Sequence, residues 1–135
     1  MQEKGKTAVT KTTGLHFATT FSSEDKARSL FGDLFGLTVI KEFSVDENLC
    51  GSLFEINQPV KIILFDAGPV AVEVFVSPET AGRSGWFDHL CVQVDDRSSF
   101  VERAEGMGLE IRRYVKNGKE IVFLKDWDGN LYEIK

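Results

Sequence analysis

Two stretches of the chain repeat one pattern, and this repeat restricts the folds that the chain can adopt. Residues 15–39 (LHFATTFSSEDKARSLFGDLFGLTV) align with residues 88–111 (DHLCVQVDDRSSFVERAEGMGLEI). In both stretches a strand-like start that carries a histidine, His16 or His89, precedes a segment with helical spacing and then a Gly-Leu pair. Self-similarity of this kind predicts two copies of one supersecondary unit.

Apolar spacing predicts the elements of the first copy. A strand over 15–21 leads into an amphipathic helix that starts at the pair Ser22 and Asp25 and ends at Gly36. The segment 50–56 (CGSLFEI) is ambiguous. The apolar side of the helix comprises Ala27, Leu30, Phe31, Leu34 and Phe35. The strands expected after the helix are 37–44, 61–67 and 70–76.

The second copy repeats this order. A strand over 89–94 precedes a helix at about 97–107, and the pair Asp128 and Gly129 supplies a tight turn between the last two strands. The helix turns Phe100, Val101, Ala104 and Met107 to one side. We therefore expect an α+β protein with a tail over 1–13, a βαβββ module over 14–78, a linker over 79–85 and a second βαβββ module over 86–135.

Composition excludes several classes of protein. The chain has 135 residues and a net charge of −5, and its lysines and arginines are scattered, so it has no basic stripe for a nucleic acid. No apolar run approaches the ~18 residues of a membrane span, and the start lacks the apolar region of a signal peptide, so we expect a cytoplasmic protein. Cys50 and Cys91 have no disulfide-scaffold or thiolate-zinc spacing, and Cys91 is expected to be a small core residue.

Side-chain alternation groups four polar residues on one kind of sheet face. In AVEVFV (71–76) the valines form an apolar face, and Glu73 lies on the opposite one. The same rule turns His16, His89 and Glu133 away from the helices. Each module then carries one histidine on its first strand and one glutamate on its last strand, and the chain has no other histidine.

A carboxylate in the middle of an apolar strand costs several kcal/mol unless it is paired, neutralised or bound to a cation. Two imidazoles and two carboxylates form a mixed nitrogen and oxygen set that suits a divalent metal ion. The competing interpretation is a solvated sheet face, which antiparallel sheets often have. The repetition of the pair in both modules favours the metal site.

These residues resemble the vicinal oxygen chelate superfamily, which contains glyoxalase I, extradiol dioxygenases, methylmalonyl-CoA epimerase and the fosfomycin and bleomycin resistance proteins. The resemblance covers about 14–135 and rests on LHFATT, AVEVFV, DHLCVQV and the ending FLKDWDGNLYEIK. That ending is similar to the family's Asp-Pro-Asp-Gly-Asn turn, with Trp127 in place of proline. The resemblance implies a cup-shaped mixed sheet around a metal and a homodimer.

The ligand pattern is most similar to that of glyoxalase I. By this resemblance His16, Glu73, His89 and Glu133 would hold a divalent ion, with Zn, Ni, Co, Mn and Fe all open. Glu133 and Glu73 would be the catalytic carboxylates, and Glu133 would move the proton. The implied activity is that of a metal-dependent lyase or isomerase, acting through an enediolate on a small substrate with vicinal oxygens.

The substrate positions depart from the glyoxalase pattern. Thr20 and Ser77 stand where glyoxalase I enzymes typically have the Arg and Asn that hold glutathione, so glutathione dependence is doubtful. The candidates for a substrate pocket are Leu53, Phe54, Arg83 and Lys116. Two other functions stay open: a metal-dependent dioxygenase, and a non-catalytic small-molecule binding protein of the bleomycin-resistance type.

Overall fold

The structure is a computed structural model, and it describes residues 11–78 and 88–135. Most of the expected tail and the whole expected linker therefore lie outside the described residues. No helix in the described part is both long and apolar enough to cross a membrane. The first module contains β1 (His16–Phe21), α1 (Glu24–Ala27), η1 (Arg28–Leu34), β2 (Thr38–Val45), α2 (Glu47–Phe54), β3 (Val60–Asp66) and β4 (Ala71–Val76). The second contains β5 (His89–Val92), α3 (Arg97–Gly106), β6 (Glu110–Lys116), β7 (Lys119–Lys125) and β8 (Leu131–Ile134).

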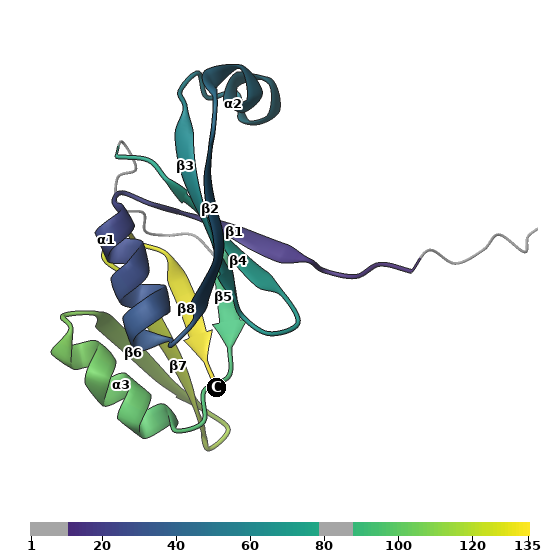
Figure 1. The fold of residues 1–135 in the computed structure, drawn as a ribbon. Helices are drawn as coiled ribbons and strands as arrows, with labels where there is room; N and C mark the ends of the chain where they lie inside the picture. The colour runs from purple at the N-terminus through teal and green to yellow at the C-terminus, as the bar shows by residue number, and fades with distance from the viewer. Residues whose placement is uncertain (1–10, 79–87) are drawn as a thin grey trace, which may run out of the picture.

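Each module forms its own four-stranded mixed sheet, so the expected α+β fold of two βαβββ modules is confirmed (Figure 1). The strand orders are β1-β4-β3-β2 and β5-β8-β7-β6. In both sheets the first strand of the module runs parallel to its last strand, and the other neighbours are antiparallel. This topology lays the histidine-bearing strand directly beside the glutamate-bearing strand in each module.

The first helix follows the predicted apolar pattern, with two differences. Its N-cap is Ser23, whose side chain accepts a hydrogen bond from the Lys26 N–H at 3.2 Å, so the expected start at Ser22 is wrong by one residue. Ser22 instead follows β1 directly and donates its own N–H to Asp128. From Arg28 to Leu34 the helix has π geometry, and Gly36, whose φ of 73° favours glycine, follows its C-cap Phe35.

The ambiguous segment is resolved as the helix α2. Asp46 caps it by accepting a hydrogen bond from the Leu49 N–H at 2.9 Å, and Glu55 ends it in the left-handed region with φ 59°. The helix lies beyond one end of β2 and β3 (Figure 1). Its Phe54 packs edge-on against Phe75 of β4, with 5.3 Å between ring centroids.

The two modules share one hydrophobic core. Phe35, which follows η1, lies 5.2 Å from Phe100 of α3 and 5.7 Å from Tyr132 of β8, measured between ring centroids. Arg103 of α3 adds a polar link by donating to the carbonyls of Asp33 and Leu34. The fully buried side chains include Phe21, Leu30, Phe31, Ile63, Phe65, Val72, Val74, Val122, Leu124, Tyr132 and Ile134. The helix-facing residues of both sheets thus pack against the helical layer, as the alternation predicts.

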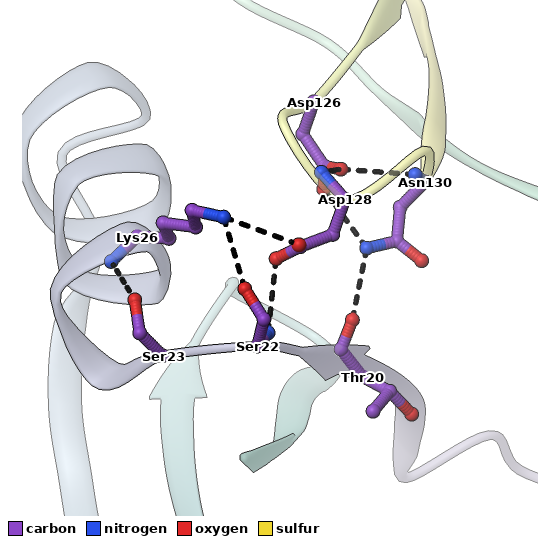
Figure 2. A network of polar contacts seen from close by, with 7 residues as sticks. All are labelled: Thr20, Ser22, Ser23, Lys26, Asp126, Asp128 and Asn130. Carbon is purple, nitrogen blue, oxygen red and sulfur yellow. Dashed lines mark hydrogen bonds and ion pairs between the residues drawn. The ribbon is translucent and has the colours of Figure 1, made fainter. Parts of the chain in front are cut away.

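A buried polar network joins the β7–β8 turn to the first module (Figure 2). Asp128, which is 3% exposed, accepts the Ser22 N–H at 3.0 Å and lies 3.4 Å from Lys26 Nζ. Asn130 donates its side-chain amide to the carbonyl of Thr20 at 3.0 Å. The turn resembling the family motif therefore holds the end of β1 against β8, and Gly129 supplies its φ of 88°.

Asp126 anchors this turn. Its carboxylate accepts hydrogen bonds from the Asp128 and Asn130 N–H groups, both at 2.9 Å, from the Asn130 amide at 3.0 Å and from the Tyr132 hydroxyl at 2.7 Å. Burial raises the pKa of Asp126, and the hydrogen bonds from Tyr132 and Asn130 oppose that shift. Three donors from the turn and one from β8 thus converge on a single buried carboxylate.

We expect Asp126→Ala to lower the free energy of unfolding by about 2–4 kcal/mol, because it leaves several buried donors without an acceptor. Tyr132→Phe removes only one of these bonds and should cost about 1–2 kcal/mol. Urea unfolding of both variants measures the difference. Asp95→Ala, at an exposed bend, is the control and should stay within about 0.5 kcal/mol of the unmodified chain. Equal losses for Asp126→Ala and the control would contradict the anchoring role.

Candidate metal centre

The first candidate pair is His16 on β1 and Glu73 on β4. The strands run parallel, with Ala18 opposite Glu73 and Ala71 opposite His16, so the two side chains are diagonal neighbours on one face. His16 Nε2 lies 3.2 Å from Glu73 Oε1. The side chains are 49% and 17% exposed, which makes Glu73 a largely buried carboxylate that faces an imidazole.

The second candidate pair, His89 and Glu133, has the same placement in the other module. Cys91 lies opposite Glu133 across the β5–β8 ladder, so His89 and Glu133 are again diagonal neighbours. His89 Nε2 lies 3.7 Å from Glu133 Oε1, and the side chains are 35% and 23% exposed. Glu133 therefore makes the longer contact of the two glutamates and is the more exposed.

Three further residues surround the second pair. The ring of Phe123 on β7 lies edge-on to His89, with 5.0 Å between centroids, and Lys135 Nζ lies 3.7 Å from Glu133 Oε2. Cys91 is exposed on the same face, so the expectation of a core residue is wrong; Cys50, which is 3% exposed, is the buried cysteine. Alternation explains the difference, since Cys91 shares its face with His89. Partial burial and the Glu133 carboxylate raise the pKa of the Cys91 thiol.

The four predicted ligands form two pairs rather than one cluster. Among residues 11–78 and 88–135, no three histidine, cysteine, aspartate or glutamate side chains come together in a way that could hold a metal ion. Each pair nevertheless offers one imidazole nitrogen and one carboxylate oxygen close together, a donor set that suits divalent ions such as Zn²⁺, Ni²⁺ or Mn²⁺. One pair supplies two ligands, whereas catalytic zinc sites use three protein ligands plus an open position.

The histidine-bearing strands lie at sheet edges. In the described part of the chain β1 pairs only with β4, and β5 pairs only with β8. Leu15 and Phe17 stand beside His16 at the start of β1 and are 73% and 52% exposed, although the alternation predicts that they meet the helix. The apolar edge next to the first pair is therefore largely uncovered in the described part of a single chain.

The predicted pocket residues have different outcomes. Phe54 lines a cavity of about 650 Å³ next to the first sheet, whereas Leu53 is 69% exposed and does not line it. Lys116 is exposed at the far end of β6, and Arg83 lies outside the described residues. Thr20 and Ser77 both line the cavity. Sequence reasoning missed the cavity's second wall, formed by Asp128 and Asn130 of the β7–β8 turn.

Paired βαβββ modules, with the first and last strand of each side by side, define the vicinal oxygen chelate fold, so the fold expected from the resemblance is confirmed. The chain superposes on a glyoxalase family protein from Bacillus cereus with a TM-score of 0.67 and 19% identity, covering 96% of this chain and 95% of that one.

Other solved structures agree on this fold. The trypanothione-dependent glyoxalase I of Leishmania major matches with a TM-score of 0.67 and 15% identity over 92% of this chain and 86% of that one. A mutant of the fosfomycin resistance protein FosX from Listeria monocytogenes, complexed with Mn(II) and a dihydroxypropylphosphonic acid, matches with a TM-score of 0.62 and 16% identity over 88% and 87%. No protein-family model and no curated protein sequence matches the chain.

Proposed function

We propose that this protein is a divalent-metal-dependent lyase or isomerase of the glyoxalase type, acting on a small substrate with two adjacent oxygens. The observation that carries the proposal is the repeated pair: His16 with Glu73 and His89 with Glu133 occupy equivalent diagonal positions in the two modules. Structural neighbours that include a glyoxalase I and a Mn(II)-bound FosX protein support a metal on this fold.

The four residues would act as ligands, and the two glutamates differ in their suitability for proton transfer. A divalent ion held there would supply Lewis-acid polarisation of a substrate oxygen. Glu133 is the better proton carrier, because its contact with His89 is longer than that of Glu73 with His16 and its side chain is more exposed. Its carboxylate would take a proton from the carbon next to a carbonyl and return it to the neighbouring carbon.

The metal centre, in this proposal, is completed by a second copy of the chain. The two pairs do not meet within the described part of one chain. The histidine of each pair lies on β1 or β5, and the outer edge of each of these strands is free in the described structure. In a twofold dimer, the first module of one copy can face the second module of the other, which gives two equivalent four-ligand sites. The exposed Leu15 and Phe17 beside His16 would then be covered by the partner.

Metal content and oligomeric state test this proposal together. Mass spectrometry of the purified protein should find about one transition metal per chain, as expected for two sites in a symmetric dimer. His16→Ala and Glu73→Ala should each lower this content strongly, because removing one ligand leaves an incomplete site. Light scattering should give twice the 15.1 kDa mass of one chain.

Glu102→Ala is the matched control, because Glu102 is an exposed glutamate on α3 and should keep full metal content. Protein that still contains no metal after reloading with Zn, Ni, Co, Mn or Fe would overturn the proposal. The four residues would then form a hydrated sheet face. A monomer that binds metal would overturn only the dimeric site.

A second candidate function is non-catalytic binding of a small molecule. The cavity beside the first sheet favours it, because the cavity is formed within a single chain and needs neither the metal nor a partner. This function predicts that ligand binding is unchanged when a chelator removes the metal, whereas the enzyme proposal predicts that turnover is lost.

A further inference from the structure

The cavity lies where three parts of the chain meet. Its floor includes Ala18 and Thr20 of β1 and Phe75 of β4, α2 closes one side with Phe54, and the β7–β8 turn forms another side. At about 650 Å³ it has the size of a small-molecule pocket, for which about 300–1,000 Å³ is usual. Both modules contribute to it, so its shape depends on the network of Figure 2.

The walls of the cavity are mostly apolar and include two aromatic rings. Phe54 and Phe75 meet edge to face at 5.3 Å between centroids and both line the cavity. Aromatic rings pack favourably against a further ring in offset or edge-on geometry. A flat aromatic group or a compact branched alkyl group fits such walls.

The charges around the cavity are unsuited to an anion. Of the described residues that line it, the charged ones are Asp88 and Asp128, and none is Lys or Arg. Lys26 lies 3.4 Å from Asp128 and offsets that charge on the side of α1, which leaves Asp88 as an acidic group at the edge. A carboxylate or phosphonate placed here would lose hydration without gaining a cationic partner among the described lining residues.

The cavity adjoins the first candidate ligand pair. Ala18, which lines it, lies opposite Glu73 across the β1–β4 ladder, and Phe75 lies two residues beyond Glu73 on the same sheet face. Two residues along a strand span roughly 7 Å. One small molecule can therefore contact Glu73 at one end and fill the cavity with the other.

We propose that this cavity binds an uncharged aromatic or compact apolar group and rejects anionic ones. The further claim that this group is a substituent of the substrate rests on the proposed function. The binding itself depends only on the cavity walls of a single chain. The substrate class that follows is a neutral aryl or alkyl compound with vicinal oxygens, in place of a glutathione or phosphonate adduct.

Two probes of the same shape and different charge test this inference on the metal-free protein. Fluorine NMR titration with para-fluorobenzyl alcohol and para-fluorobenzoate measures both affinities. We expect the alcohol to bind at least about tenfold more tightly, because none of the described residues that line the cavity is a cation that could pair with the carboxylate. Metal-free protein is used so that this result is independent of the metal centre.

Variants connect the probe to the cavity. Phe54→Ala should weaken binding of the alcohol by about fivefold, because it removes one aromatic wall. Leu53→Ala, at the adjacent exposed position, should leave binding unchanged. Thr20→Arg places a cation in the cavity and should reverse the preference to the benzoate, whereas Thr20→Gln, of similar length without charge, should keep it. Far-UV circular dichroism checks that each variant is folded.

Equal affinity for both probes, or binding that neither Phe54→Ala nor Thr20→Arg changes, would overturn the inference. Alcohol affinity that falls as protein concentration rises would also overturn it, by indicating that a second copy of the chain fills the cavity. Selective alcohol binding by a protein that takes up no metal would support the cavity and overturn the proposed function, so the two failures are distinguishable.

Discussion

A heterodimer of two metal-free double variants is expected to recover about half of the metal content of the unmodified dimer. One chain carries His16→Ala with Glu73→Ala, and the other carries His89→Ala with Glu133→Ala. The homodimer of either double variant should bind no metal, since each of its sites has lost one of its two His–Glu pairs. In the heterodimer the intact first module of one chain faces the intact second module of the other, which restores one of two sites.

Co-expression with two different affinity tags, followed by sequential purification, isolates the heterodimer for metal analysis. A dimer that carries the same double variant on both chains is the control and should stay empty. Sites formed within one chain would leave the heterodimer empty as well, because neither chain then holds both pairs. That result would reject the shared site even if the unmodified protein binds metal.

Glu133→Gln is expected to lower kcat by about 10²–10⁴-fold, the usual contribution of a positioned acid or base. The amide keeps the size of the side chain and removes its ability to accept a proton. Turnover is measured with methylglyoxal and several thiols on metal-loaded protein. Because the lost interaction belongs to the transition state, kcat and kcat/KM should fall together while KM changes little.

Glu120→Gln is the matched control, because Glu120 lies on β7 of the same sheet and its contacts at 3.8 and 3.7 Å are with Arg97 and Arg113 rather than with the histidines. It should retain activity. Metal content is measured for both variants, so that loss of a ligand is separated from loss of a proton carrier. Full turnover in Glu133→Gln at normal metal content would end the assignment of Glu133.

Much of the fold follows from the spacing of apolar residues in the chain. The helical pattern of Leu30, Phe31 and Leu34 is buried as expected, because such an apolar stripe gains free energy only when other elements cover it. The segment 50–56 is ambiguous in the sequence because it contains only the second half of the helix α2, which begins at Glu47. The decisive signal was the cap Asp46, which precedes that window.

The candidate site could be predicted in part for a similar reason. Strand alternation is a local rule, and it turned each histidine and glutamate to the correct sheet face. Alternation does not state how much of a face the rest of the chain covers. Phe17 lies on the face that alternation assigns to the helix side, yet its side chain is half exposed. The same rule places Cys91 on the face of His89, and the exposed Cys91 follows this rule rather than the preference of cysteine for the core.

The sequence alone determined the repeat, the two βαβββ modules and the residue types that can bind a metal, because periodicity and side-chain chemistry are local properties. The tertiary structure decided which residues meet. Parallel pairing of β1 with β4 and of β5 with β8 joins the ligands into pairs, and the shared core keeps the pairs of one chain apart. Contacts between distant segments depend on how whole sheets and helices pack, which local spacing does not specify.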